Sequence, residues 1–202
     1  CWICNTASGM TQTDSLAARR AMIDSQLRTS GINAPFVLER MAAVPREDFL
    51  PAGQHAAAYI DRTVMLDDGG ALAAPVFYGA LLSEAAPRLD DTVLVVEGGT
   101  GYLAALVAPL VAAVKRVTAA EAASGKLRGS HSLVLVDGAV EDAAALARLL
   151  AEDGRIVTGL VERGVTRLAS GRKAGAALAL LPVGEMGIPR LSDFDRPRVW
   201  SF

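Results

Sequence analysis

Cysteine and histidine are scarce in this chain of 202 residues, and charge of one sign does not dominate it. Cys1 and Cys4 form a single CxxC, while His55 and His131 stand alone, so no second ligand pair completes a metal site. The remainder has no cysteine, which suits a reducing compartment and predicts a cytoplasmic protein. The formal net charge of −2 excludes the basic field that attracts nucleic acid or anionic membranes.

Long apolar runs are also missing. The richest stretch, Leu103 to Val114, is shorter than the roughly 18 residues of a membrane span and predicts a buried helix. With 51% hydrophobic residues, the chain can build one core, so residues 10–202 are expected to form a single, monomeric domain. Residues 1–9 lack the regions of a signal peptide and precede Met10, which indicates a leader or a non-native extension.

Two helices are predicted near the N-terminus. Residues 15–28 place Met22, Ile23 and Leu27 on one apolar side, and Gly31 follows that helix. Asn33 is positioned to cap a second helix that starts at residue 35 and stops at 44, before a proline.

From about residue 92 the pattern changes to alternating strands and helices. Gly154 is expected just past the end of the second of these helices, and residues 170–173 are expected to turn a hairpin. The predicted strands are 92–96, 114–119, 132–136, 155–161, 165–169 and 176–181, and the predicted helices are 102–113 and 141–151. Such an order is typical of an α/β fold with a mostly parallel, doubly wound sheet and an antiparallel C-terminal hairpin.

A glycine-rich turn, Gly98, Gly99 and Gly101, follows the first of these strands. Ligands of open α/β sheets bind beyond the carboxyl ends of the strands, and glycine lets a ligand approach the backbone closely. The spacing is neither GxGxxG nor GxxxxGK[ST], which disfavours a dinucleotide or a phosphate loop. A tight structural turn without a ligand explains the glycines equally well.

Two acidic residues are candidates for the same edge of the sheet. Glu121 lies 22 residues after Gly99, where a ribose hydroxyl finds its acidic partner, although it can also simply open a surface helix. Asp137 ends the strand 132–136 and can bind an amine or act as a base. The alternative for Asp137 is a cap of the next helix or a turn with Gly138.

Several stretches resemble the protein-L-isoaspartate O-methyltransferase family. They are residues 22–32, 37–51, 58–61, 98–102, 136–141 and 153–157. The resemblance implies a seven-stranded methyltransferase sheet, S-adenosylmethionine as methyl donor, and isoaspartyl residues of proteins or peptides as substrate. It implies cofactor contacts at Glu97, Gly98, Gly99, Thr100, Gly101, Tyr102, Glu121 and Asp137, and substrate contacts at Leu72, Ala73, Ala74 and Pro75. No catalytic residue is assigned, because holding the donor in line with a carboxylate supplies most of the rate gain.

Three departures from that family pattern point to a weakened or lost cofactor site. Val95 and Glu97 stand where an acidic residue and a glycine are expected, and a side chain is costly wherever glycine-only angles are required. Leu72, Ala73 and Ala74 replace a polar stretch before Pro75. Only 15 residues separate Glu121 from Asp137, too few for a helix, a strand and an adenine loop, so one edge strand is expected to be missing.

Two other functions remain open from the sequence. The first is a catalytically impaired relative that binds a protein or peptide partner. The second is an α/β reductase, which the short glycine turn and the N-terminal helices disfavour. The tail from residue 187 to 202 ends with Trp200 and Phe202, which are expected to pack on the sheet.

Overall fold

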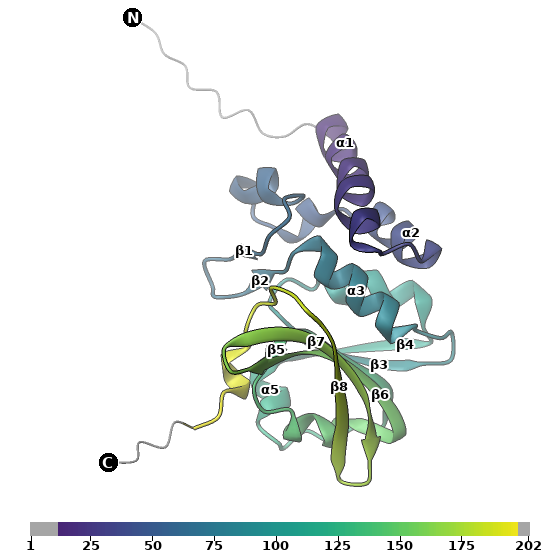
Figure 1. The fold of residues 1–202 in the computed structure, drawn as a ribbon, viewed down its shortest axis with the longest axis vertical. Helices are drawn as coiled ribbons and strands as arrows, with labels where there is room; N and C mark the ends of the chain where they lie inside the picture. The colour runs from purple at the N-terminus through teal and green to yellow at the C-terminus, as the bar shows by residue number, and fades with distance from the viewer. Residues whose placement is uncertain (1–11, 198–202) are drawn as a thin grey trace, which may run out of the picture.

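The computed structural model describes residues 12–197 (Figure 1). The predictions about residues 1–9, including the CxxC, and about Trp200 and Phe202 lie outside the described residues. Within residues 12–197, no helix has the length and apolar character needed to cross a bilayer.

One six-stranded mixed sheet organises the molecule, in the order β4-β3-β5-β6-β7-β8. The first four of these strands run parallel to one another, while β7 is antiparallel to both β6 and β8. The strands are β3 (Thr92–Glu97), β4 (Ala113–Thr118), β5 (His131–Val140), β6 (Leu150–Glu162), β7 (Val165–Ala174) and β8 (Ala177–Glu185). The predicted α/β class, mostly parallel with an antiparallel C-terminal hairpin, is confirmed.

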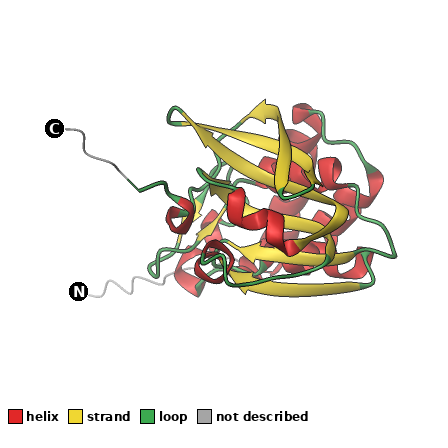
Figure 2. Ribbon diagram, turned by 90° about the horizontal axis from the view of Figure 1, so that it is seen from below, coloured by secondary structure: helices red, strands yellow, loops and turns green. Residues whose placement is uncertain are grey.

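Two apolar layers cover the two faces of this sheet. Val93 and Val95 of β3 join the cluster beneath the N-terminal helices, whereas Leu94 and Val96 join the cluster on the opposite face. This alternation is the period of two that a strand buried on both sides requires. The helices are α1 (Gln12–Met22), α2 (Pro35–Ala43), α3 (Pro75–Ala85) and α4 (Tyr102–Val107) with the first cluster, and α5 (Ala119–Ala123) with the second (Figures 1 and 2).

The predicted N-terminal helices are confirmed, with one corrected cap. α1 continues into a π-helical turn, Ile23–Leu27, and a 3-10 turn, Arg28–Ser30, before Gly31 takes a φ of 82°. α2 begins at Pro35, and its cap residue is Ala34 without a side-chain hydrogen bond, so the prediction of an Asn33 cap is wrong. Because Pro35 has no N–H, one fewer free donor needs a cap there.

Between α2 and the main sheet, two 3-10 turns lead to a small hairpin. The turns are Arg46–Phe49 and Ala52–Ala57, and the hairpin pairs β1 (Val64–Met65) with β2 (Ala71–Leu72). The hairpin delivers the chain to α3, whose side chains are mostly buried between the sheet and the N-terminal helices. These elements were not predicted, because α3 is apolar nearly all round and lacks an amphipathic period.

Two predicted helices in the second half are shorter or absent. α4 ends at Val107, and a 3-10 turn containing Pro109 follows, since proline cannot donate the next helical hydrogen bond. The helix predicted over 141–151 is wrong, because only a 3-10 turn, Ala144–Leu149, forms before β6 begins. Gly154 therefore lies inside β6, where an added Cβ would come within 2.9 Å of the His131 carbonyl oxygen on neighbouring β5.

The C-terminal hairpin turns later than predicted. Residues 170–173 lie within β7, and the reversal is at Gly175, whose φ is 63°. At the other edge of the sheet, residues 124–130 connect α5 to β5 without a strand, and β4 forms the edge. Within residues 12–197 the main sheet thus has six strands and not the seven that the resemblance implied, as the short interval between Glu121 and Asp137 indicated.

Candidate cofactor-binding site

The glycine turn lies where the strand order reverses. β3 is followed in the chain by β4 on one side and then by β5 on its other side, so their carboxyl ends frame a crevice. Gly99 and Gly101 adopt φ values of 115° and 78°, which favour glycine. An added Cβ on Gly99 would lie 2.6 Å from the Gly70 Cα atom, because the β1–β2 hairpin packs against this turn.

Thr100 and Tyr102 connect the turn to α4. The Thr100 hydroxyl accepts a hydrogen bond from the Tyr102 amide at 3.3 Å. The Tyr102 ring is fully buried, 4.9 Å from the Tyr78 ring and 5.1 Å beneath the Arg46 guanidinium. Tyr102 therefore supports the turn from below, and its side chain does not face the crevice.

Glu97 is the last residue of β3 and has no left-handed backbone angle. The expected conformational penalty at this position is therefore wrong, since the extended strand accepts any side chain. Glu97 Oε1 accepts a hydrogen bond from Arg116 Nε at 2.6 Å, whereas its buried Oε2 has no hydrogen-bond partner among the described residues. The Glu97 side chain is 10% exposed, against 59% for Arg116.

Asp137 lies inside β5, which continues to Val140, so the predicted turn or helix cap is wrong. The pairing with β6 shows why: four steps along β5, from Leu135 to Ala139, match only two along β6, and this bulge contains Asp137. The carboxyl group is buried, and neither oxygen makes a hydrogen bond of good geometry within residues 12–197, although the Tyr78 hydroxyl and the Gly98 amide lie close enough to favour its charged form. Burial raises the pKa of Asp137 to about 7, and the negative charge of Glu97 adds to this, while the nearby Tyr78 hydroxyl opposes it.

Glu121 caps the start of α5. Its Oε2 accepts hydrogen bonds from the Thr118 amide at 2.8 Å and the Thr118 hydroxyl at 2.9 Å, and its own amide donates to Thr118 Oγ1. These hydrogen bonds from Thr118 lower the pKa of Glu121. Glu121 opens a surface helix, as one of the two sequence interpretations holds, and a ribose contact stays a prediction.

A hollow of about 230 Å³ opens at this edge. The glycine turn and the end of β4 line one side of it, and residues 190–193 of a C-terminal segment line the other. That segment is held by backbone hydrogen bonds from Ala139 to Pro189 and from Leu191 to Ala139, at 2.7 and 2.8 Å. The lining residues are Gly69, Glu97, Gly98, Gly99, Thr118, Ala119, Arg190, Leu191, Ser192 and Asp193.

The sequence alone did not predict that residues 190–193 line the hollow, or that Arg116 pairs with Glu97. No local pattern connects residues 190–193 to the glycine turn, because only the folded chain brings them there. Arg116 had a usable signal: in two parallel neighbouring strands, a basic residue two positions before the end of one can reach an acidic residue that ends the other.

The predicted substrate segment adjoins the glycine turn. The Ala71 amide, one residue before it, donates a hydrogen bond to the Gly98 carbonyl at 2.9 Å. Leu72, Ala73 and Pro75 are buried, and Ala74 is half-buried. The structure therefore places this segment beside the candidate cofactor residues, with most of its side chains directed into the core.

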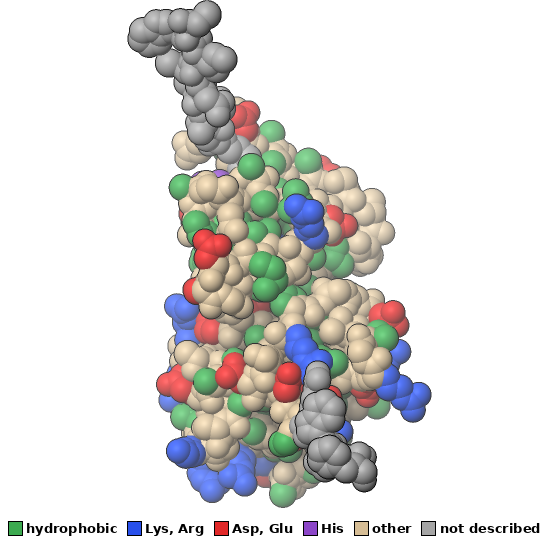
Figure 3. All heavy atoms as spheres, turned by 90° about the vertical axis from the view of Figure 1, so that its left-hand side faces the viewer, with side chains coloured by type: hydrophobic (Ala, Val, Ile, Leu, Met, Phe, Trp, Pro, Cys, Tyr) green, Lys and Arg blue, Asp and Glu red, His purple; other side chains and the backbone are tan. Residues whose placement is uncertain are grey.

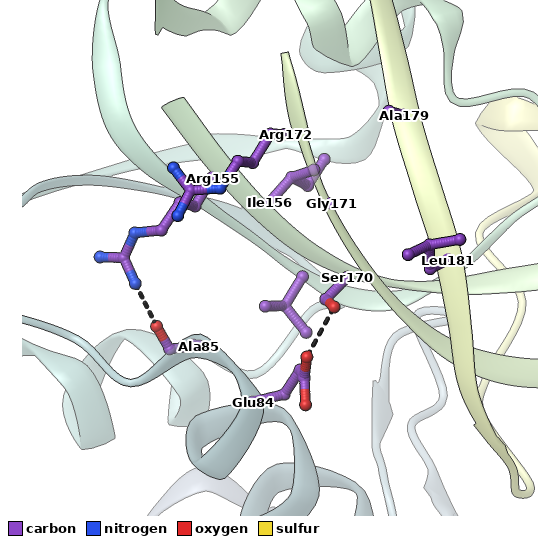
Figure 4. Close-up of a pocket in the computed structure, with 10 residues that line it drawn as sticks. Glu84, Ala85, Arg155, Ile156, Ser170, Gly171, Arg172, Ala179 and Leu181 are labelled. Carbon is purple, nitrogen blue, oxygen red and sulfur yellow. Dashed lines mark hydrogen bonds between the residues drawn. The ribbon is translucent and has the colours of Figure 1, made fainter. Parts of the chain in front are cut away.

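A second hollow, of about 410 Å³, lies between the end of α3 and strands β6, β7 and β8, away from the glycine turn (Figure 4). Its polar groups are already paired: Ser170 donates to Glu84, and Arg155 donates to the Ala85 carbonyl, both at 2.6 Å. None of the predicted site residues lines it. On the face from which the C-terminal segment emerges, acidic and basic side chains are interspersed (Figure 3).

Comparison of the chain with known proteins points to one family. The model of the protein-L-isoaspartate(D-aspartate) O-methyltransferase (PCMT) family matches residues 17–140. The chain is 42% identical over 96 residues, 48% of its length, to a protein-L-isoaspartate O-methyltransferase of Koribacter versatilis. It is 38% identical over 114 residues, 56% of its length, to one of Aeropyrum pernix. These matches span 43% and 44% of the relatives' own lengths, so the chain aligns with under half of each.

Solved structures confirm the fold. A Plasmodium falciparum structure, described as a protein-L-isoaspartate O-methyltransferase in complex with S-adenosyl-L-homocysteine, superimposes with a TM-score of 0.69 at 15% identity. The superposition covers 89% of this chain and 98% of that one. A second protein-L-isoaspartate O-methyltransferase superimposes with a TM-score of 0.68 at 16% identity, covering 86% of this chain and 65% of the other. With a family model that matches well over half of its residues, the chain belongs to the protein-L-isoaspartate(D-aspartate) O-methyltransferase family.

Proposed function

We propose that this chain is an S-adenosylmethionine-dependent methyltransferase that esterifies isoaspartyl carboxylates of proteins or peptides. The observation that carries the proposal is the Gly98–Gly101 turn. It lies at the reversal of strand order, inside the segment that the family model matches. Gly98 and Gly99 line a hollow together with Glu97, and the buried Asp137 carboxyl adjoins Gly98. The activity for which the Koribacter and Aeropyrum relatives are named supports the reaction, and the ligand named with the Plasmodium structure supports the cofactor.

The residues of the turn fit such a donor. Gly98 and Gly99 line the hollow, and their lack of a side chain lets the turn pack tightly against Asp137 and the Gly70 backbone, which fixes its shape. Glu97 and Asp137 supply unpartnered carboxylate oxygens suited to the cationic groups of the donor. We assign the ribose contact to Glu121, and Thr100, Gly101 and Tyr102 to the support of the turn.

When bound, S-adenosylmethionine supplies an electrophilic methyl group. The acceptor carboxylate is already a nucleophile, so the task of the chain is to hold the two reactants in line and limit access of water. The segment Leu72–Pro75, next to the turn, is our candidate for orienting the acceptor. Because most of its side chains are buried, its backbone would make those contacts.

The size of the hollow favours a second candidate function. About 230 Å³ is below the range of roughly 300–1,000 Å³ that is typical of small-molecule sites. A full nucleoside donor would therefore extend beyond this hollow. A relative that binds a protein or peptide partner without catalysis is therefore the alternative.

Calorimetric titration with S-adenosylmethionine separates the two functions. The methyltransferase proposal predicts saturable binding below millimolar ligand and methyl transfer to an isoaspartyl peptide, with the matched aspartyl peptide as control. Absence of binding at millimolar donor, together with no transfer, would leave only the partner-binding alternative.

A further inference from the structure

Two carboxyl groups lie beside the glycine turn, and one of them, that of Glu97, lines the hollow. Glu97 Oε2 and both oxygens of Asp137 are buried without a hydrogen-bond partner among residues 12–197. Asp137 adjoins the glycine turn, because a Cβ added to Gly98 would lie 3.1 Å from its carboxyl carbon. Buried carboxylate oxygens are costly unless a cation or a donor satisfies them. Because Glu97 lines the hollow, its buried and unpartnered Oε2 marks a place for a cationic group there.

Three arginines lie near the turn and the hollow. Arg190 lines the hollow but is already paired with Glu141 and Asp195. Arg46 is fully buried under Tyr78 and Tyr102, where its guanidinium donates to the Ala58 and Ala73 carbonyls, so it is fixed in the core. Arg116 is different. It projects from the edge strand β4, is 59% exposed, and contacts only one oxygen of Glu97.

Arg116 also covers the glycine turn. A Cβ added to Gly101 would lie 2.8 Å from one terminal nitrogen of the Arg116 guanidinium, so this cation lies over the start of α4. Arg116 itself lies mostly in water, so it can leave Glu97 when a ligand cation takes its place beside that buried carboxylate.

We propose that Glu97 and Arg116 form an exchangeable ion pair that makes the site selective for ligand charge: the guanidinium of Arg116 occupies the place of a ligand cation, and a positively charged methyl donor displaces it. This inference rests on the proposed function and adds two specificity-determining residues to it. The donor carries a sulfonium, while its demethylated product is a neutral thioether. The site therefore favours the donor over the product.

The test compares the dissociation constants of S-adenosylmethionine and S-adenosylhomocysteine by calorimetry. The ammonium and carboxylate groups are common to both ligands, so the ratio of their affinities isolates the charge of the sulfonium. Wild type, Glu97→Gln and Arg116→Gln are measured beside Lys115→Gln, which removes the same charge from the neighbouring position of β4. Thermal unfolding of each variant checks that it folds, and the exposed position of Arg116 keeps that variant informative if Glu97→Gln does not.

Arg116→Gln is expected to strengthen donor binding about fivefold more than product binding, and Glu97→Gln to reduce the preference for the donor by a similar factor. Lys115→Gln should leave the ratio within about twofold, because its charge does not contact Glu97. If Arg116→Gln binds the donor and wild type does not, the ion pair is supported, but the wild-type chain is not an active methyltransferase. Equal ratios in all variants would overturn the ion pair and leave the proposed function standing. If no variant binds either ligand, both are overturned.

Discussion

At the scale of single residues, Asp137 combines burial with a pKa of about 7. In the unfolded chain this carboxyl ionises near its ordinary value of 3.8, so between about pH 4 and 7 the folded protein binds more protons than the unfolded one. Its contribution to stability is therefore lost as the pH rises through that window, and stays low above it.

Asp137→Asn should remove this pH dependence. We expect the variant to be more stable than wild type at pH 8, by on the order of 3 kcal/mol, and to differ little at pH 4. Urea unfolding at several pH values measures the difference. Asp90→Asn, at an exposed position, is the control and should show no such trend. An unchanged pH slope in Asp137→Asn would show that the carboxyl is not buried as described.

Alanine substitutions at Gly99 and Gly69 distinguish two costs, the backbone strain of a positive φ and the steric clash of an added Cβ atom. Both have a positive φ, 115° and 88°, but an added Cβ meets the Gly70 backbone at 2.6 Å from Gly99 and nothing within 4 Å from Gly69. Gly69→Ala should cost about 1 kcal/mol of unfolding free energy, from strain alone. Gly99→Ala should cost at least about 2 kcal/mol and weaken donor binding, because the β1–β2 hairpin must move. Equal losses measured by urea unfolding would contradict this packing.

Part of the candidate site could be predicted from individual residues. The positive φ angles of Gly99 and Gly101 follow from where glycine occurs, and the sequence placed that turn at the correct strand end. The burial of Asp137 could not be foreseen, because it depends on a bulge in β5 that no local pattern announces. The capping box at Glu121 was visible as Thr118 three residues earlier, and it fixes this carboxylate at the start of α5.

At the scale of elements, Arg46 joins segments that are distant in the sequence. From the 3-10 turn Arg46–Phe49, its guanidinium donates to the Ala58 carbonyl at 2.6 Å and to the Ala73 carbonyl at 2.8 Å. Arg46→Met keeps most of the side-chain volume but leaves both buried carbonyls without this donor. We expect a loss of about 3 kcal/mol in unfolding free energy.

Hydrogen exchange locates the effect of Arg46→Met. Amides of residues 58–73 should lose protection before those of the main sheet, because the lost donor ties that segment to the core. Arg62→Met, at an exposed position, is the matched control and should change stability by less than about 0.5 kcal/mol. If protection is lost uniformly across the sheet, Arg46 stabilises the whole fold and not the segment 58–73 in particular.

The elements that were predicted correctly have strong local patterns. The β-branched run of β3 and the apolar side of α1 and its continuation are examples. The helix predicted over residues 141–151 failed because helix propensity competes with strand pairing. Residues 150 and 151 begin β6 instead, and Leu146, Leu149 and Leu150 fill the second apolar cluster from a 3-10 turn and a strand.

At the scale of the whole molecule, the order of strands and helices was enough to predict the fold class. The chain alternates buried strands with helical segments and ends in a hairpin. Few topologies connect such elements without crossing loops. The number of strands was harder to foresee, because an interval of 15 residues shows that something is missing but not how the sheet ends. The sheet ends in two edges, β4 and β8.

The β8 edge is the one that exposes apolar surface. Leu181 and Val183 are 73% and 51% exposed on this strand, and an edge strand offers free backbone groups to another chain. Leu181→Lys should reduce concentration-dependent light scattering on heating, because a charge on an edge strand opposes pairing between molecules. Its unfolding free energy should change by less than about 0.5 kcal/mol, since the side chain is exposed.

The matched control is Leu89→Lys. It removes a leucine that is 82% exposed in the loop before β3, and it should leave the scattering unchanged. If both variants reduce scattering equally, apolar exposure in general and not the strand edge drives the association.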